Sequence, residues 1–371
     1  MKRIFLISSF LLLIILQFEN CKNASTCNQL DSSCNPISSI VLERAIRNSR
    51  YGLTFSPPGG TYKYDPFVTI TSNSTATIRY TLDGSEPSCT NGTIYTAPAP
   101  ILGAKSQTLR AAACVDSVVA ATKTDQYTVT LSPLAASNLR FWYSADSIGN
   151  IPGLEVKVWN DYSGNGNHLY PSSTGTSSPT IVANALNGKA AVRLTSTQKQ
   201  FFNSRSATGY IGSKAGVGAM VLRKYSSQTD EVYFSIGFLG NVPNARNWKA
   251  NTTNQSICSS LSPAPTNCAG AATTAIPTTG YNMILFSTDA SGVTTYYYNG
   301  VADGTGTIAT PTAFSSANVF LLGTGLNVVN YLDAEILEVI FFETGFDAGG
   351  INTIHCYIQN KYGLAVGSNC T

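Results

Sequence analysis

One loop carries oxygen-bearing side chains at the spacing of a calcium-binding loop. The loop has Asp161, Ser163 and Asn165 at alternate positions, followed by Gly166 and Asn167. They match positions 1, 3, 5, 6 and 7 of the EF-hand loop, but Ser172 replaces the bidentate glutamate at position 12. Two roles stay open: a weak calcium site, the one cofactor the sequence indicates, or a turn whose side chains cap backbone amides. The turn is favoured because a single carboxylate does little to offset dehydration of a divalent ion.

Cysteine is the second reactive residue type, and the chain has nine. An odd number leaves one cysteine without a partner in an exported protein. The other eight form four pairs that are close in the sequence: Cys27 with Cys34, Cys89 with Cys114, Cys258 with Cys268, and Cys356 with Cys370. No Cys-x-x-Cys motif or Cys/His cluster favours metal binding, so we predict four disulfides in an oxidising compartment.

The remaining cysteine, Cys21, follows a segment with the features of an export signal. Lys2 and Arg3 precede an apolar run from Ile4 to Leu16, which is too short to span a bilayer. Cys21 stands where a bacterial lipoprotein carries its lipidated cysteine, although Phe18 and Asn20 depart from the usual lipobox. We therefore expect a signal peptide over residues 1–20 and lipid, including an acyl chain such as palmitate, on Cys21. The alternative is an ordinary signal peptide cut elsewhere, with Cys21 in a disulfide.

Composition limits the classes of partner and of fold. Only 12% of the residues are charged, and the formal net charge of +3 includes charges in the expected signal peptide. No dense run of Lys or Arg exists, so nucleic-acid binding is not expected. Abundant Ser, Thr, Asn, Gly and aromatic residues favour β-sheets over long surface helices. Residues 21–50 are read as the lipidated cysteine and a tether.

The segment 51–131 has the period-two alternation of short half-buried strands, for example over 77–82 and 109–114. Its motifs resemble the chitobiase/β-hexosaminidase C-terminal domain family: Pro58–Tyr62, Ile78–Pro87, Tyr95 and Thr108–Ala111. The resemblance implies an immunoglobulin-like sandwich that serves as a non-catalytic spacer or binding module. Asp83 and Glu86 lie in an Asp-Gly-Ser turn, where an aspartate bonds to its own backbone, so we do not expect them to be catalytic.

A second domain is expected over 138–371. Its predicted strands are 139–143, 190–194, 217–223, 231–238, 281–287, 294–298, 317–322 and 335–342, and a helix with an Asp347 N-cap and a Gly363 C-cap is predicted over 347–362. The motifs Leu139–Asp146, Val158–Asn167, Asn187–Leu194, Tyr298–Gly300, Glu338–Phe342 and Lys361–Leu364 resemble the laminin-G-like, concanavalin A-like jelly rolls of bacterial surface proteins. The expected fold class is thus all-β: an immunoglobulin-like sandwich followed by a jelly roll with one C-terminal helix.

Because this type of jelly roll includes glucanases, a pair of carboxylates is a further candidate site. The nearest match to a Glu-x-Asp-x-x-Glu pattern contains Asp333, Glu335 and Glu338. The odd spacing predicts that Glu335 and Glu338 lie on opposite faces of a strand, and Glu338 falls where the resembled family has a structural glutamate. There is no Gly-x-Ser-x-Gly motif, and the only histidines are His168 and His355. We expect no enzyme.

Trp248 is a candidate ligand contact, because polar residues surround it and an exposed indole could stack on a sugar. Its alternative is a ring folded onto the loop between Cys258 and Cys268.

The combined interpretation is a non-enzymatic, lipid-anchored surface protein of the outer membrane that binds a glycan or an extracellular protein. Two alternatives remain: a glycan hydrolase using Asp333 and Glu335, and a purely structural envelope lipoprotein.

Overall fold

The computed structural model describes residues 46, 49–136, 138–172, 177–205, 215–228, 230–238, 241–251, 254–258, 268–270, 272–307, 319–326, 328–365, 367 and 370. The expected signal peptide, the lipidated Cys21 and the Cys27–Cys34 pair lie outside these residues. By Cα proximity the chain divides into two compact units. Of the described residues, one unit contains those up to Phe55 with Ile70–Tyr95 and Thr108–Asp125, and the other contains those of Ser56–Thr69, Thr96–Gln107 and Gln126–Thr371.

Residues 53–129 form the strands of a small immunoglobulin-like β-sandwich, as predicted. Its three-stranded sheet has the order β1 (Leu53–Ser56), β3 (Phe67–Ser72) and β6 (Ala99–Pro100). Its five-stranded sheet has the order β2 (Gly60–Tyr62), β8 (Val118–Val129), β7 (Ser106–Val115), β4 (Thr77–Thr81) and β5 (Thr93–Ile94). In the turn after β4, Asp83 Oδ1 accepts from the Ser85 amide at 3.0 Å and from the Ser85 hydroxyl at 2.6 Å. This geometry matches the structural role expected for Asp83.

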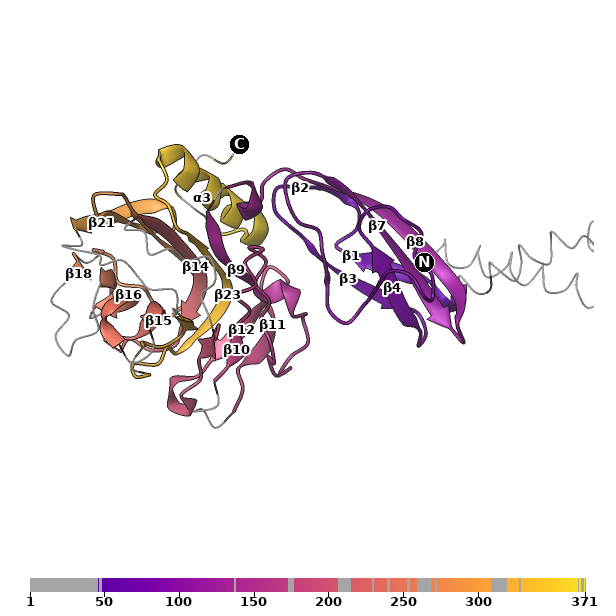
Figure 1. Ribbon diagram of the computed structural model, residues 1–371, viewed down its shortest axis with the longest axis horizontal. Coiled ribbons are helices and arrows are strands. Elements are labelled where there is room, and N and C mark those ends of the chain that lie inside the picture. The colour runs from indigo at the N-terminus through magenta and orange to yellow at the C-terminus, as the bar shows by residue number, and fades with distance from the viewer. Residues whose placement is uncertain are drawn as a thin grey trace, which may run out of the picture. The chain divides into compact units, whose positions relative to one another are not determined.

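A larger antiparallel β-sandwich follows, again as predicted (Figure 1). Its seven-stranded sheet has the order β10 (Tyr170–Pro171), β13 (Phe202–Asn203), β22 (Val319–Leu322), β15 (Val232–Phe238), β16 (Asn241–Asn251), β17 (Asn254–Cys258) and β18 (Cys268–Ala269). Its eight-stranded sheet contains β11 (Thr180–Leu186), β12 (Lys189–Leu194), β23 (Ala334–Phe342), β14 (Gly216–Lys224), β19 (Asn282–Thr288), β20 (Val293–Tyr298) and β21 (Val301–Thr307), with β9 (Leu139–Ser144) pairing with β23.

The two sheets enclose a core of buried aromatic and aliphatic side chains contributed by both, including Phe141, Trp159, Phe234, Phe286 and Phe341. A second apolar cluster lies on the opposite face of the eight-stranded sheet. It joins Val221, Leu285 and Ile340 of that sheet to Ile354 and Ile358 of α3 (Ala348–Tyr362). We call the face that contributes to the first cluster the inner face and the other the outer face. Helix α3 therefore covers part of the outer face.

The ends of α3 follow the predicted caps. The Asp347 side chain accepts a hydrogen bond from the Gly350 amide at 2.8 Å. Gly363 ends the helix with φ of 67°, and its amide donates to the Gln359 carbonyl. A glycine suits this position because the left-handed region is unfavourable for residues with a Cβ. No helix within the described parts of the chain is both long and apolar enough to cross a bilayer.

Candidate functional site

The predicted calcium loop is organised around one carboxylate. Asp161 Oδ1 accepts from the amides of Trp142 at 3.1 Å and Ser163 at 2.9 Å. Its Oδ2 accepts from the Ser163 hydroxyl at 2.8 Å and the Asn167 amide at 2.9 Å. The Asn165 side-chain amide donates to the Leu139 carbonyl at 2.8 Å. These side chains tie the loop to β9, so the geometry favours the turn over the calcium site.

The prediction that Trp248 exposes its ring is wrong. Trp248 has 0% exposure and lies in the core between the two sheets. Its ring makes edge contacts with Phe234 at 5.5 Å and Phe286 at 4.9 Å between centroids. The polar neighbours Asn247 and Lys249 alternate with Trp248 and Ala250 along β16, and only the latter two join this core. Polar flanks thus reflect strand alternation rather than exposure of the tryptophan.

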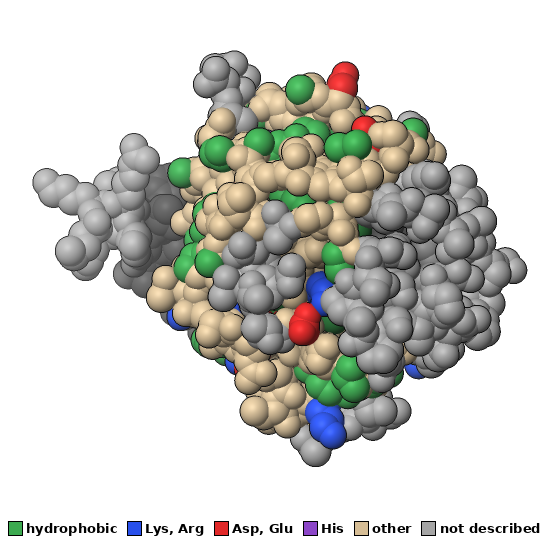
Figure 2. All heavy atoms as spheres, turned by 90° about the vertical axis from the view of Figure 1, so that its left-hand side faces the viewer, with side chains coloured by type: hydrophobic (Ala, Val, Ile, Leu, Met, Phe, Trp, Pro, Cys, Tyr) green, Lys and Arg blue, Asp and Glu red, His purple; other side chains and the backbone are tan. Residues whose placement is uncertain are grey.

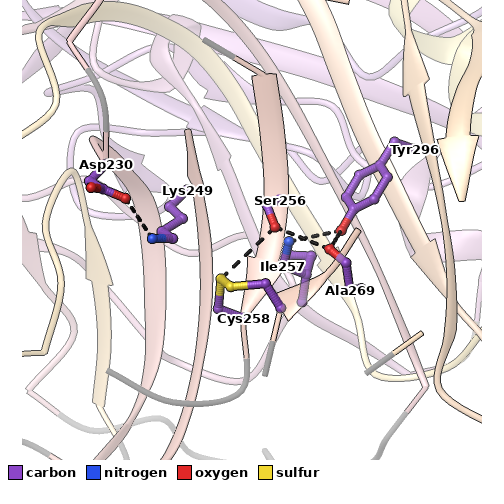
Figure 3. Close-up of a disulfide and its surroundings, with 8 residues drawn as sticks. Asp230, Lys249, Ser256, Ile257, Cys258, Ala269 and Tyr296 are labelled. Atoms are coloured by element: carbon purple, nitrogen blue, oxygen red, sulfur yellow. Dashed lines mark hydrogen bonds and ion pairs between the residues drawn. A yellow bond between two sulfur atoms is a disulfide. The ribbon is translucent and has the colours of Figure 1, made fainter. Parts of the chain in front are cut away.

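Three of the four predicted disulfides are present: Cys89–Cys114, Cys258–Cys268 and Cys356–Cys370. They indicate a protein that resides outside the cytoplasm. Figure 3 shows the Cys258–Cys268 bond, which joins β17 to β18. Beside it the hydroxyls of Ser256 and Tyr296 both donate to the Ala269 carbonyl at 3.1 Å, so this region is held by internal bonds.

The predicted separation of Glu335 and Glu338 onto opposite faces of a strand is also wrong. On β14, Val221 pairs with Glu338 but the next residue, Leu222, pairs with Ile336, so β23 carries an extra residue. Such a β-bulge reverses the alternation beyond it. Glu338 consequently contacts Trp142 and the α3 residue Lys361, while Glu335 accepts hydrogen bonds from the hydroxyls of Tyr225 and Tyr281. Both glutamates therefore lie on the outer face.

A concave region with mostly polar lining lies where loops meet at one end of the larger sandwich. This cavity of about 340 Å³, called the polar pocket below, is lined by Ser196, Thr197, Gln228, Glu231, Asn330 and Tyr331. The lining side chains carry hydroxyl, amide and carboxylate groups, which can form hydrogen bonds with a polyhydroxylated ligand. Its volume lies in the usual range of ligand sites, about 300–1,000 Å³.

Three segments position the pocket: the 3₁₀ turn Ser196–Gln198, the connection between β14 and β15, and the connection between β22 and β23. Asp333 binds them together. Its amide donates to Glu231 Oε1 at 3.2 Å, its carbonyl accepts from the Tyr225 amide at 2.9 Å, and its Oδ2 accepts from the Ser196 hydroxyl at 3.0 Å. The pocket is thus built by the fold before any ligand arrives.

The same loops hold several residues in left-handed backbone conformations. Asp230 has φ of 66°, Asn330 of 62° and the β-branched Val328 of 56°. A β-branched residue with positive φ is a conformational outlier that the surrounding structure must enforce. Here the Val328 carbonyl accepts from the Tyr331 hydroxyl at 2.9 Å, and its amide donates to Gly325 at 2.8 Å. Such outliers cluster at binding sites, where they preorganise the lining.

The side chains that line the polar pocket differ in whether they already form hydrogen bonds or ion pairs within the protein. Glu231 accepts from the Ser226 hydroxyl at 3.0 Å and pairs with Lys224 at 2.7 Å. By contrast, the side chains of Thr197, Gln228 and Asn330 are exposed and have no intramolecular hydrogen bond to the described residues. These three groups can bind a ligand without breaking bonds of the fold.

Each carboxylate at the pocket is matched by a cation. Lys224 pairs with Glu231, Arg193 with Asp333, and Lys249 Nζ lies 2.6 Å from Asp230 Oδ1. These ion pairs hold the acidic side chains in place around the polar pocket.

Two other cavities have different linings. One of about 200 Å³ beneath α3 is bordered mainly by apolar side chains such as Ile340, Phe342 and Phe346. Another of about 570 Å³ lies at the β20–β21 hairpin, where the Asp303 carboxylate accepts from the hydroxyls of Thr273 and Thr274 at 2.6 Å. Neither combines several exposed, uncommitted polar groups with left-handed loop residues. In the described portion of the chain, no group of three or more His, Cys, Asp or Glu is placed to hold a metal ion.

The space-filling view of one face agrees with the low charge content (Figure 2). On its described atoms, uncharged polar and hydrophobic side chains predominate and charged ones are few. The described part of this face therefore shows no broad basic surface of the kind that binds nucleic acid.

Comparison with known proteins locates one family match. Residues 57–130 match the model of the chitobiase/beta-hexosaminidase C-terminal domain. A search of curated proteins found no significant match to the chain.

Among solved structures, domain 4 of AbnA, an extracellular GH43 arabinanase from Geobacillus stearothermophilus solved in complex with arabinotriose, is 21% identical with a TM-score of 0.42. That match covers 59% of this chain and 98% of the other. The binding domain of Paraclostridial Mosquitocidal Protein 1 is 12% identical with a TM-score of 0.42, covering 59% of this chain and 52% of that one. The binding domain of botulinum neurotoxin serotype D is 10% identical with a TM-score of 0.41, covering 59% and 51%. All three likenesses are too distant to assign a function.

Proposed function

We propose that this chain is a non-enzymatic recognition protein on the cell surface, and that its larger sandwich binds a glycan in the polar pocket. The observation that carries the proposal is the set of uncommitted side chains of Thr197, Gln228 and Asn330 around a preformed cavity. A sugar ring presents several hydroxyls that both donate and accept, which matches a lining of hydroxyl and amide groups.

The surface location is part of the same proposal. The three disulfides support an extracytoplasmic protein. The export signal before Cys21 supports lipid anchoring, since a diacylglycerol and an additional acyl chain give stable membrane attachment that one chain does not. The small sandwich then serves as a non-catalytic module between the tether and the glycan-binding domain.

Binding of the purified chain from Lys22 to Thr371 to a glycan array tests the proposal. We expect saturable binding of at least one glycan, weakened at least tenfold by Q228A and by N330A. Both side chains are exposed, so Q228A should not disturb folding. Because Asn330 has φ of 62°, N330G is a second variant that removes the side chain without placing another Cβ in the left-handed region. The matched control is N352A on α3, which removes the same type of side chain outside the pocket lining and should bind as the unchanged chain does.

Two results would contradict the proposal. Release of reducing sugar from a bound polysaccharide, abolished by D333N or E335Q, would show the hydrolase instead. Absence of binding to every glycan and to extracellular-matrix proteins would leave the structural envelope role.

A further inference from the structure

A row of alternating charge crosses the outer face of the eight-stranded sheet beside the polar pocket. In the strand register, Glu335 on β23 lies opposite Arg193 on β12 and opposite Arg223 on β14. The neighbouring residues Val192 and Leu222 belong to the inner core, so the side chains of the row point outward. We call Arg193, Arg223 and the nearby Tyr225 the arginine clamp.

The Tyr225 ring contacts the guanidinium groups of both Arg193 and Arg223. The Arg193 guanidinium carbon lies 4.1 Å from the centre of the Tyr225 ring, and that of Arg223 lies 4.8 Å from it. The ring itself is 41% exposed. Cation–π contacts of this kind fix the orientation of a guanidinium while leaving N–H groups free to donate.

The acidic side chains of the row are already engaged. Asp333 pairs with Arg193 and accepts from Ser196. Glu335 accepts from the hydroxyls of Tyr225 and Tyr281 instead of pairing with an arginine. Burial raises the pKa of both tyrosine hydroxyls, and their hydrogen bonds to Glu335 raise it further, so they remain protonated donors.

Arg223 forms no salt bridge with a described residue, although Glu335 lies opposite it in the strand register. No hydrogen bond joins its side chain to a described residue, and its Nε is buried without a partner. Because Arg223 as a whole is only half-buried, its terminal N–H groups, and not the enclosed Nε, would meet a ligand. The guanidinium fork matches the two oxygens of a carboxylate, with which it forms paired hydrogen bonds.

We infer that the arginine clamp binds the carboxylate of an acidic sugar, of the uronic acid type, whose neutral part or neighbouring residue occupies the polar pocket. The inference rests on the proposed glycan binding. The two sites are linked through Asp333, which pairs with Arg193 of the clamp and hydrogen-bonds to Ser196 and Glu231 of the pocket. A neutral glycan would fill the pocket but bring no carboxylate to the Arg223 guanidinium, so the ligand should be acidic.

Calorimetric titration with an oligogalacturonate and with the same oligosaccharide after reduction of its carboxyl groups tests this inference. The unchanged chain should bind the acidic form at least tenfold more tightly. R223Q should remove this preference while changing affinity for the reduced form less than twofold, and R223K should retain part of it because it keeps the charge but not the fork. The control K157Q removes a cation whose side chain is 73% exposed and should retain the preference.

The outcomes separate the two proposals. If Q228A and N330A abolish binding but R223Q leaves the acidic preference intact, the pocket assignment stands and the clamp assignment is wrong. If R223Q weakens both forms equally, Arg223 is structural. Tighter Arg223-dependent binding of a sulfated glycan than of the uronate would replace the carboxylate by a sulfate. If no oligosaccharide binds the unchanged chain, both proposals fail.

Discussion

Lys361 Nζ lies 2.6 Å from Glu338 Oε2, and the two side chains are fully buried. The Trp142 indole donates to Glu338 at 2.6 Å, and the hydroxyls of Tyr357 and Tyr362 also donate to it. Burial and the adjacent Glu338 charge raise the pKa of both tyrosines well above the usual value, so they stay neutral donors. This network fixes α3 to β23 and β9.

Removing one partner of this pair should destabilise the protein strongly. K361M leaves the Glu338 charge buried without its cation, and such losses cost about 3–5 kcal/mol. Chemical denaturation should show a loss of this size. The double variant E338Q/K361M should be less destabilised than the sum of the single variants, because neither charge is then left alone. K157M, at an exposed lysine, should change stability by less than about 0.5 kcal/mol. An equally small effect of K361M would show that the pair is not buried in solution.

Strands, helix and disulfides of the larger sandwich were predictable because each has a local signature. The expected strand 217–223 is β14, Gly216–Lys224, and the expected helix 347–362 is α3, Ala348–Tyr362. Alternation defines the former, and Asp347 and Gly363 define the ends of the latter. The close spacing of Cys258 and Cys268 likewise matched adjacent strands.

The wrong predictions concern features that depend on how strands pair and pack. The bulge in β23 depends on its pairing with β14, which no spacing within β23 reveals. The polar neighbours of Trp248 wrongly predict an exposed ring, because they lie on the alternate face of its strand. The polar pocket could not be predicted because its lining comes from three segments far apart in the sequence. Taken one at a time, Glu231, Asn330 and Asp333 are ordinary loop residues. The role proposed for Arg223 likewise depends on the position of Glu335 on the neighbouring strand and on the contact with the Tyr225 ring.

His355 should make the protein less stable in acid. Burial lowers the pKa of His355 to about 4 from 6.5, because the ring has 2% exposure and packs against Tyr297 at 5.4 Å. The folded state therefore disfavours the proton that the unfolded chain accepts. The free energy of unfolding is therefore unaffected by this histidine above a pH of about 6.5. It falls as the pH is lowered toward 4, by about 3 kcal/mol in total, because only the unfolded chain takes up the proton in this range.

Urea denaturation at several pH values should show this loss, and H355F should lack it. The difference between the two proteins isolates the histidine from other titrating groups. One of these is Asp65, whose pKa burial raises to about 7, so that its effect on stability has the opposite sign. Parallel pH profiles for the unchanged chain and H355F would contradict the assignment.

Cys21 should carry the membrane anchor. C21A, expressed with its leader, should yield a soluble or unprocessed protein, whereas the unchanged chain should enter the detergent phase and incorporate labelled fatty acid. Mass spectrometry of unreduced peptides should also show Cys27 joined to Cys34. A disulfide between Cys21 and another cysteine, with no lipid label, would support the ordinary signal peptide instead.

Calcium should leave thermal stability unchanged, because the Asp161 carboxylate already accepts four hydrogen bonds from Trp142, Ser163 and Asn167. An ion would have to displace these donors, and the loop offers no second carboxylate in compensation. Substitution D161A should nevertheless lower the stability by about 3 kcal/mol, since it leaves buried backbone amides without acceptors. D161N, which keeps an oxygen acceptor, should be affected less. Calorimetric scans with and without millimolar calcium measure both effects. A calcium-dependent rise in Tm of the unchanged chain that is absent from D161N would instead establish the loop as a metal site, since ligand binding to the folded state raises its stability.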